Sequence, residues 1–392
     1  MSPPVSPHLL WAATLGCTLG LVLSIGCGGQ RADASAEPAS AIAQARNLGL
    51  HSRVRPDFPN LECQDGPCVQ DNTAPLRHNT PWSEGGCTHP RIEPNCQNGW
   101  CLVPAGCFIM GSPEDEFARS FPEEYQVPVW FTRPFHIQQH MFTYGEWMAL
   151  GLDPPAPEPV VPDSFEACRE PSCPLAFLNL FEAWMLANLV SETHSPPLPH
   201  CYGLSDCHGE IGKGAVCKSV HHTPSNLLDC SGFRLPTEYE WEYAARAGTR
   251  APFYTNEPTP RCSLCSGLPL LDLVAWYGGN SEGRSHPVAQ KLPNQWGLFD
   301  TIGNWFEWTN SCFNTIHCPY PVVDPGGAYV PCERHVGRGG DFSFWPSNLR
   351  VARRQDILLN TRSAGVRLVR TGAQTPGRLL NSPTTMESAV KD

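Results

Sequence analysis

The chain has 392 residues and a net charge of −11, with 27 Lys and Arg residues against 38 Asp and Glu residues. A nucleic-acid-binding domain needs a clustered basic face, so this balance excludes nucleic acid as a partner. The 41 prolines and 34 glycines predict short elements joined by long loops. Twelve tryptophans and 17 phenylalanines still supply a sizeable core.

The N-terminus predicts export. Leu9 to Ile25 is an uncharged, largely apolar run, which suits a signal-peptide core and is slightly short for a membrane span. It is followed by Gly26 and Cys27, which resemble a bacterial lipoprotein cleavage box, although Ser24 stands where leucine is usual. Cleavage without lipid is the competing interpretation. We expect an extracytoplasmic protein, lipid-anchored at Cys27 or secreted, whose membrane contact is confined to this N-terminal signal or anchor.

The 19 cysteines are the second strong signal. Such density is typical of an oxidising compartment and predicts a disulfide-rich protein. A zinc ribbon would need two matched Cys-x2-Cys pairs, and only Cys262 and Cys265 have that spacing. The sequence leaves the connectivity of the disulfides open.

Composition divides the chain into four parts. We predict a signal peptide over residues 1–27, a tether and cysteine-rich lead-in over 28–100, one compact domain over 101–370 and a disordered tail over 371–392. The lead-in is rich in Gly, Ala, Ser and Pro up to about residue 60, which is typical of a tether.

Within the compact part, the pattern alternates between short strands and capped helices. Strands are predicted over 101–110 and 130–137, and two more between Gly337 and Arg370. Thr143 with Glu146 has capping-box spacing and predicts a short helix, and residues 181–190 read as an amphipathic helix. Residues 196–230 hold four cysteines without a strong period, which indicates a disulfide-pinned insertion.

The stretch RLPTEYEWEYAARAG, residues 234–248, is the most clearly delimited helix. Thr237 and Glu240 form a second capping box, and Gly248 provides a left-handed stop. Trp241, Ala244 and Ala245 form an apolar stripe. We expect a surface helix docked on the core by Trp241, with a structural role.

The order of several motifs resembles the formylglycine-generating enzyme (sulfatase-modifying factor) family. The motifs are LVPAGCFIMGS, the capped TYGEW, CPLAFLNLFEAWMLAN, GFRLPTEYEWEYAARAGT, AWYGGN, HPVAQKLPNQWGLFDTIGNWFEWTN, GRGGDF, LRVARR and AGVRLVR. The resemblance spans roughly residues 101–370. It implies one α/β domain with little regular secondary structure, related to the C-type lectin-like fold.

The family's oxidases hold copper with two cysteines, which suits a soft cuprous ion. In the family these cysteines stand in the interval that corresponds here to Asp341–Val351, and this interval contains no cysteine. Cys332 is the last cysteine of the chain. Copper-dependent formylglycine generation is therefore not expected, and the catalytic residues of any other reaction stay unknown.

The resemblance also implies a structural calcium loop. Its ligands would be the side chains of Asp300 and Glu307 and the backbone carbonyls of Gly303 and Trp305. Calcium takes six to eight hard oxygens from such groups. The alternative is that the two carboxylates cap backbone groups in a tight turn.

A ligand groove is predicted near Asp341–Val351, the interval in which the family's oxidases have their copper-binding cysteines. The candidate groove residues are Asp341, Phe344, Trp345, Arg350 and Arg353. The arginines could hold a carboxylate, or they could pair with acidic residues of the same chain. The first functional hypothesis is a binding or accessory protein whose ligand is a peptide, glycan or protein. The alternative is an enzyme of the wider family with non-copper chemistry on an exported peptide or small molecule.

Overall fold

The computed structural model describes residues 93–120, 122–155, 168–255, 269–313, 321–326 and 332–372, together with the backbone of 62–63 and 66–67. All of these belong to the unit that runs from Asn60 onward. The predicted signal peptide, Cys27, the tether and the tail beyond residue 372 lie outside the described residues. Within the described ranges, no helix has the length and apolar character needed to cross a membrane.

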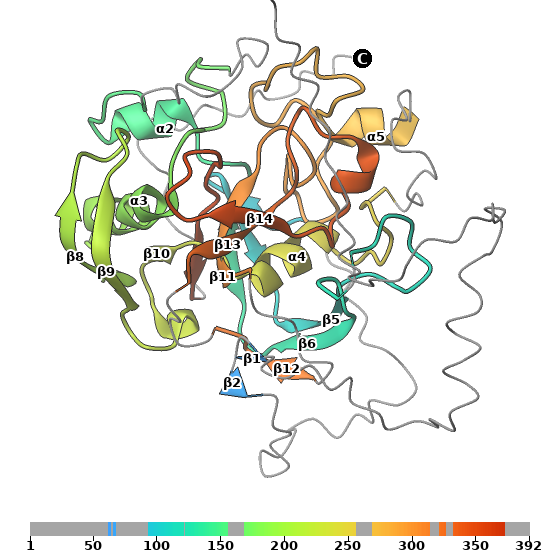
Figure 1. The fold of residues 1–392 in the computed structure, drawn as a ribbon, viewed down its shortest axis with the longest axis horizontal. Helices are drawn as coiled ribbons and strands as arrows, with labels where there is room; N and C mark the ends of the chain where they lie inside the picture. Colours follow the sequence, from blue (N-terminus) through green and yellow to red (C-terminus); the bar gives the residue numbers. More distant parts are fainter. Residues whose placement is uncertain are drawn as a thin grey trace, which may run out of the picture. The chain divides into compact units, whose positions relative to one another are not determined.

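A five-stranded antiparallel sheet contains Val369–Thr371, the last strand of the described residues, and Phe233–Arg234, which Figure 1 labels β10. Its order is β10 (Phe233–Arg234), β15 (Val369–Thr371), β7 (Phe135–Gln138), β4 (Trp100–Val103) and β3 (Cys96–Gln97). The C-terminal strand β15 lies between β7 and β10, with Arg370 opposite His136 on one side and Phe233 on the other. Because β3 belongs to this sheet, ordered structure begins before the predicted boundary at residue 101.

Two smaller sheets and two hairpins complete the strands. One sheet contains β11 (Glu307–Cys312), β13 (Arg334–Arg338) and β14 (Gln355–Leu358). The other contains β12 (Val322–Val323), β6 (Val127–Phe131) and β5 (Gly106–Met110), with β12 parallel to β6. The hairpins are β8 (Tyr202–His208) with β9 (Val216–His222) and β1 (Glu62–Cys63) with β2 (Gly66–Pro67).

Two predicted strands are each divided in the structure. Residues 101–110 form β4 and β5, and residues 130–137 form the end of β6 and β7. Each pair of strands lies in two different sheets. Pro104 and Pro134 occupy the breaks, and proline cannot donate to a ladder within a strand. The prediction of strands in these two ranges is therefore confirmed, but the prediction of one continuous strand in each range is wrong.

The helices are short, and their N-termini follow the predicted capping chemistry. They are α2 (Tyr144–Ala149), α3 (Leu180–Thr193), α4 (Glu238–Arg246) and α5 (Pro269–Val274), with 3-10 turns at Leu227–Asp229 and Pro346–Asn348. Reciprocal capping boxes join Thr143 to Glu146 and Thr237 to Glu240, as predicted. The left-handed turn that ends α4 begins at Ala247, one residue before Gly248.

Helix α4 is buried, which corrects the expectation of a surface helix. All nine of its residues are buried. Each of its three carboxylates has an arginine partner, which a buried acidic side chain needs. Glu240 pairs with Arg234 at 2.7 Å and Glu242 with Arg246 at 2.7 Å, both with nearly fully buried side chains. The apolar stripe alone did not reveal this environment, because two further partners of these carboxylates, Arg338 and Arg354, lie about a hundred residues away in the chain.

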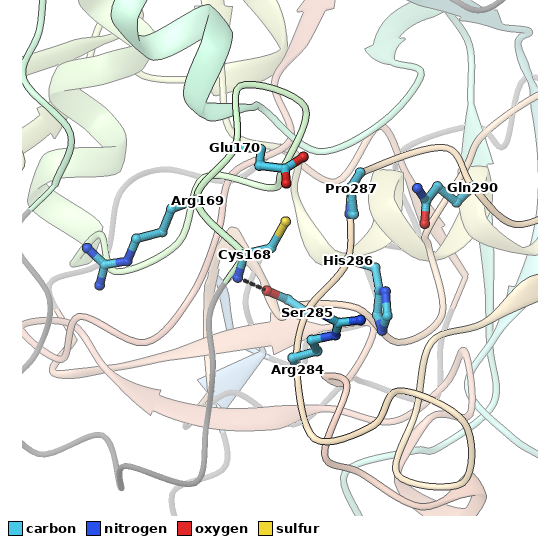
Figure 2. A pocket seen from close by; sticks show the side chains of 8 residues that line it. All are labelled: Cys168, Arg169, Glu170, Arg284, Ser285, His286, Pro287 and Gln290. Carbon is cyan, nitrogen blue, oxygen red and sulfur yellow. Dashed lines mark hydrogen bonds between the residues drawn. The ribbon is translucent and has the colours of Figure 1, made fainter.

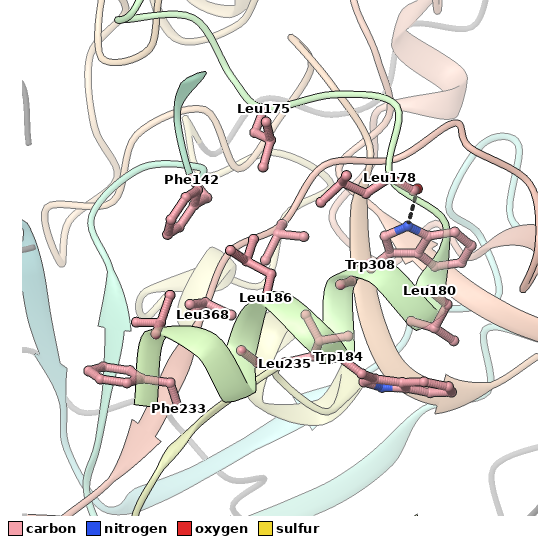
Figure 3. Packing of buried hydrophobic residues seen from close by; sticks show 14 of the residues in the cluster. Phe142, Leu175, Leu178, Leu180, Trp184, Leu186, Phe233, Leu235, Trp308 and Leu368 are labelled. Carbon is pink, nitrogen blue, oxygen red and sulfur yellow. Dashed lines mark hydrogen bonds between the residues drawn. The ribbon is translucent and has the colours of Figure 1, made fainter. Parts of the chain in front are cut away.

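The largest core cluster surrounds α3 (Figure 3). Trp184 and Leu186 of α3 pack in a cluster with Trp308 of β11 and Leu368, and all four are buried. The indole Nε1 of Trp308 donates to the carbonyl of Leu178 at 3.0 Å, so its polar atom is satisfied inside the core. This cluster anchors β11, whose first residue is one of the calcium candidates.

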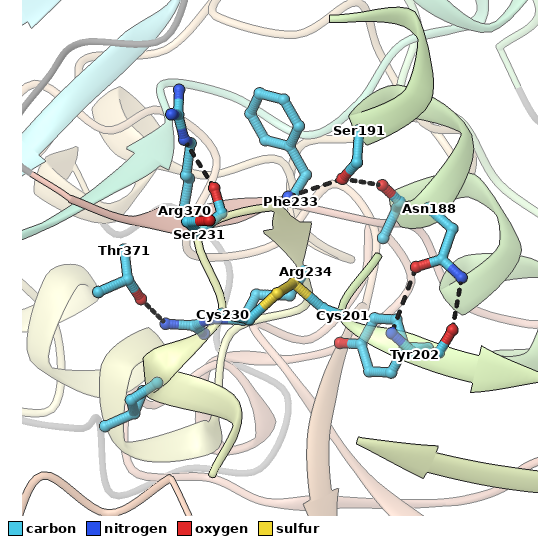
Figure 4. The surroundings of a disulfide bond; sticks show 12 residues. Asn188, Ser191, Cys201, Tyr202, Cys230, Ser231, Phe233, Arg234, Arg370 and Thr371 are labelled. Carbon is cyan, nitrogen blue, oxygen red and sulfur yellow. Dashed lines mark hydrogen bonds between the residues drawn. A yellow bond between two sulfur atoms is a disulfide. The ribbon is translucent and has the colours of Figure 1, made fainter. Parts of the chain in front are cut away.

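Five disulfides join two cysteines that both belong to the described residues. They are Cys96–Cys101, Cys168–Cys173, Cys201–Cys230, Cys207–Cys217 and Cys312–Cys332. The predicted insertion is pinned as expected, by the two nested bridges that close at Cys230 and Cys217. Around the Cys201–Cys230 bridge, the amide of Asn188 bonds both the N–H and the carbonyl of Tyr202, which ties the hairpin to α3 (Figure 4).

Candidate functional site

The segment Asp341–Val351 carries several aromatic side chains, and hydrogen bonds join its backbone to a neighbouring loop. Phe344 lies edge-on to Phe306, with ring centroids 4.9 Å apart. The carbonyl of Phe344 accepts from the N–H of Gly278 at 2.8 Å, and that of Phe342 accepts from Ser281 Oγ at 2.7 Å. These bonds hold the segment against the loop of residues 278–281.

Asp341 is bonded within its own turn. One carboxylate oxygen accepts from the N–H of Ser343 at 2.7 Å and from its hydroxyl at 2.6 Å. Burial raises the pKa of Asp341 despite these hydrogen bonds. Trp345, which precedes the 3-10 turn at Pro346, is half-buried, as is Phe344.

Arg350 turns away from solvent into an ion-pair cluster. Its side chain is fully buried, and its guanidinium contacts Glu124 at 2.6 Å and Glu116 at 2.7 Å. Arg353 is half-buried, contacts the hydroxyl of Ser120, and has a pKa lowered by burial. Of the five groove candidates, Asp341, Phe344, Trp345 and Arg353 thus keep exposed surface, whereas Arg350 serves internal pairing.

A polar hollow of about 720 Å³ is lined by residues of two other segments (Figure 2). Its walls come from residues 168–170 and 284–287 and from Gln290. Arg169, Glu170 and Arg284 are exposed, so the hollow carries two cations and one anion at its surface. The N–H of Cys168 donates to Ser285 Oγ at 2.9 Å and joins the two walls.

His286 forms the buried part of the hollow. Its ring stacks on Trp276, with centroids 3.7 Å apart, and its Nε2 lies 2.9 Å from the carbonyl of Ser281. Burial lowers the pKa of His286, so the imidazole is neutral at pH 7 and Nε2–H donates to that carbonyl. The ring is therefore fixed in one orientation.

Asn304 connects the hollow to the aromatic segment. Its side-chain amide accepts from the N–H of His286 at 2.9 Å and donates to the carbonyl of His286 at 3.0 Å. Its own carbonyl accepts from the N–H of Phe342 at 3.0 Å. Sequence reasoning missed this hollow because its two walls are distant in the chain, and the bond from Cys168 to Ser285 has no sequence signature.

The calcium candidates fit a cation unequally. Asp300 is buried, and one of its carboxylate oxygens has no hydrogen-bond partner, while the other accepts from the N–H of Ala289 at 2.7 Å. Burial raises the pKa of Asp300, and the nearby charge of Glu307 contributes in the same direction. An unpartnered buried carboxylate oxygen is the donor that a hard cation takes.

Glu307, by contrast, already has cationic and neutral donors. Arg367 bonds its Oε1 at 2.7 Å, and the indole of Trp241 donates to its Oε2 at 2.6 Å. Gly303 donates its N–H to the carbonyl of Gly339 at 2.8 Å, and Trp305 donates its indole N–H to the carbonyl of Ser363 at 3.0 Å. Of the two carboxylates, only Asp300 has an oxygen without a hydrogen-bond partner, and calcium at these residues stays a prediction.

Comparison with known proteins identifies the domain. Residues 88–372 match the model of the sulfatase-modifying factor enzyme 1-like domain. The chain belongs to this family. The formylglycine-generating enzyme of Streptomyces coelicolor is 28% identical over 274 residues, which cover 64% of this chain and 81% of the relative. The inactive C-alpha-formylglycine-generating enzyme 2 of Bos taurus is 41% identical over 85 residues, or 20% of this chain and 27% of the relative.

Solved structures agree on the fold of this family. Treponema denticola variable protein 1 superposes with a TM-score of 0.52 at 23% identity, covering 69% of this chain and 94% of that one. PvdO of Pseudomonas aeruginosa gives a TM-score of 0.50 at 23% identity, covering 73% and 99%. The α/β architecture with little regular secondary structure is thereby confirmed, and the expected relation to C-type lectin-like folds is consistent with it. The bridges of the structure confirm the expected disulfides.

Proposed function

We propose that this family member is an exported binding or accessory domain without formylglycine-generating oxidase activity. The observation that carries the proposal is the contact between Phe344 and Phe306 in a segment that has no cysteine. A cuprous ion needs soft ligands such as thiolates. An edge-on aromatic pair offers none.

The cysteines elsewhere in the domain support this proposal. Every cysteine whose side chain is described, from Cys96 to Cys332, is disulfide-bonded. Cys332 is bonded to Cys312 rather than free to enter the segment. The bovine relative whose name declares it inactive supports the view that the family's fold occurs without its oxidation chemistry.

The polar hollow and the neighbouring aromatic residues provide the binding surface in this proposal. Arg169 and Arg284 can pair with a carboxylate, while Glu170 attracts a cationic group. Phe344 and Trp345 supply an apolar edge. A peptide combines these chemical features, and a glycan or protein surface with an acidic group is the alternative ligand class.

Calcium and membrane attachment complete the proposal. Calcium would be held through Asp300 with the carbonyls of Gly303 and Trp305 and a shared Glu307, and its role would be structural. Lipid attachment at Cys27, or secretion after cleavage, would place the domain outside the cytoplasm. The enzymatic alternative would have to use the half-buried Asp341 or the neutral His286.

A direct assay tests the loss of oxidase activity. The purified protein is incubated with copper, oxygen and a cysteine-containing sulfatase peptide, and aldehyde formation is followed by mass spectrometry. We expect no aldehyde and no stoichiometric copper. Catalytic conversion of the peptide would overturn the proposal.

A binding assay tests the hollow. Peptide and glycan arrays are probed with the wild type, Arg284→Ala and Trp345→Ala. We expect both variants to lose binding, while Arg133→Ala, which removes an exposed ion pair with Asp229, keeps it. Equal binding by all four proteins would place the ligand elsewhere and contradict the assignment of the hollow.

A further inference from the structure

A disulfide and a buried histidine meet at the end of the β11–β13 ladder. Cys312 ends β11, and its cross-strand neighbour in β13 is His335. Cys332 lies three residues before His335 and is bonded to Cys312. Its sulfur lies 3.5 Å from Nε2 and 3.6 Å from Nδ1 of His335.

The three side chains have the chemistry of zinc ligands and lie close together. One ligand atom from each of Cys312, Cys332 and His335 lies within 4.8 Å of the others. In a tetrahedral site, Zn–S bonds of about 2.3 Å and Zn–N bonds of about 2.0–2.1 Å place sulfur and nitrogen roughly 3.5 Å apart. The distances between Cys332 and His335 match this separation. Among the side chains that the structure describes, no other group of three His, Cys, Asp or Glu residues converges in this way.

Hydrogen bonds, in addition to the disulfide, hold the backbone at this position. The N–H of Phe313 donates to the carbonyl of Arg334 at 2.8 Å, next to the pair formed by Cys312 and His335. The N–H of Leu359 donates to the carbonyl of Glu333 at 2.9 Å and fixes the chain just after Cys332. Arg354 donates to the carbonyl of Cys312 at 3.3 Å. The ligands therefore stay neighbours when the S–S bond is absent.

Access to the cluster is one-sided. His335 is 1% exposed and Cys312 is 7% exposed, whereas Cys332 is half-buried. The ring of Trp184 covers His335 edge-on, with centroids 5.8 Å apart. A reductant or an ion can reach the sulfurs from the side of Cys332, and water from the same side can complete a fourth coordination position.

We propose that reduction converts this cross-link into a zinc site with Cys312, Cys332 and His335 as ligands. A dithiol reductant supplies two electrons and two protons, so the S–S bond breaks, two thiols form and the reductant closes its own disulfide. Zn²⁺ then displaces both thiol protons and accepts the lone pair of one imidazole nitrogen. The disulfide and the zinc ion are mutually exclusive states of the same residues.

The test compares oxidised and reduced protein in metal titrations. The full chain is reduced with dithiothreitol, freed of it by gel filtration under argon, and titrated with Co²⁺ and then with Zn²⁺. We expect one equivalent of cobalt with a thiolate charge-transfer band, displaced by zinc, in the reduced protein and no such band in the oxidised protein. His335→Ala should weaken zinc binding about tenfold or more, since even residues that only support ligands have effects of that size.

Matched variants separate this site from the other thiols that reduction creates. Cys312→Ser with Cys332→Ser should abolish the band, while Cys207→Ser with Cys217→Ser should leave it unchanged. Zinc should also protect Cys312 and Cys332, but not Cys207 and Cys217, from iodoacetamide. The proposal is overturned by an unchanged band in the first double variant, by the absence of saturable binding, or by loss of the native near-UV spectrum when reduced protein is held with zinc.

Discussion

Glu238 and Arg338 form an ion pair of 3.1 Å, and neither side chain is exposed to solvent. Glu238 lies at the start of α4 and also accepts from Arg354 at 2.9 Å. Arg338 ends β13 and reaches Glu242 as well, at 3.0 Å. Two arginines from the C-terminal part of the domain thus neutralise two carboxylates on one face of α4.

Breaking this network by Glu238→Gln should destabilise the domain strongly. The substitution leaves Arg338 and Arg354 buried without their shared carboxylate, and removal of one partner from a buried pair costs about 3–5 kcal/mol. Urea unfolding followed by tryptophan fluorescence measures the change. As a control, Glu210→Gln removes the exposed pair with Lys213 and should leave the midpoint unchanged. Similar midpoints for both variants would contradict the role assigned to α4.

Arg350→Met should lower the free energy of unfolding of the domain more than Arg353→Met does. Burial raises the pKa of Glu124, but the hydrogen bonds and charge of Arg350 outweigh this effect and leave that pKa below its usual value. Removing Arg350 therefore costs about 3–5 kcal/mol at pH 7. Arg353, whose contact is to the Ser120 hydroxyl, should cost less.

The Arg350 substitution also has a defined pH dependence. Because the folded pKa of Glu124 is depressed, its contribution is present above the unfolded value of about 4.3 and is lost as the pH falls. The difference between wild type and Arg350→Met should therefore shrink below pH 4. A constant difference down to pH 3 would show that Glu124 does not depend on Arg350.

The effect of Asp300→Asn on thermal stability should depend on whether calcium is present. At about a hundred times its Kd, calcium would stabilise the wild type by about 2.7 kcal/mol, and the variant should not respond. In chelator, the variant should be as stable as the wild type or more stable, because a buried carboxylate without a full set of partners is removed. Thermal unfolding in calcium and in chelator measures both effects, and identical wild-type curves would eliminate the calcium site.

In chelator, the contribution of Asp300 to the stability of the wild type should also fall as the pH rises. Burial raises the folded pKa of Asp300 above the unfolded value of about 3.9, so the folded state holds its proton longer. Stability from this group is then greatest below pH 4 and falls as the pH rises through the raised value. Asn at this position should remove that slope.

The two nested bridges of the hairpin should differ in their contributions to stability. Cys201 and Cys230 are 29 residues apart, whereas Cys207 and Cys217 are 10 apart. The loop-entropy relation gives about 3.6 kcal/mol for the longer loop and about 2.8 kcal/mol for the shorter one. Double alanine variants compared by urea unfolding test this order. The reverse order would mean that native packing, rather than loop length, controls the effect.

Much of the local structure could be predicted from the sequence because it depends on neighbouring residues. Capping boxes at Thr143 and Thr237 are contacts between residues three apart, so their spacing is visible in the sequence. The bridge Cys96–Cys101 is also short-range, but the sequence left its pairing open and the structure supplies it. The absence of cysteine from Asp341–Val351 is also visible in the sequence alone, because it concerns residue types and not their arrangement in space.

The environments of these elements could not be predicted in the same way. The burial of α4 depends on Arg338 and Arg354, which lie about a hundred residues away in the chain. The hollow depends on the contact between Cys168 and Ser285. Arg350 was a groove candidate because its charge was visible, while its partners Glu116 and Glu124 were not recognisable as neighbours. Each miss concerns pairing across long sequence separations.

The position of β15 has a consequence for how the protein is made. Its neighbours β7 and β10 end at Gln138 and Arg234, while β15 begins only at Val369. At ribosomal rates of about 5–20 residues per second, the two earlier strands wait on the order of ten seconds for the strand that separates them. Until then each presents an unpaired edge, which is a site for aggregation. We therefore expect a nascent chain of this family member to need protection until β15 is released, and C-terminal truncation before Val369 should yield insoluble protein rather than a smaller domain.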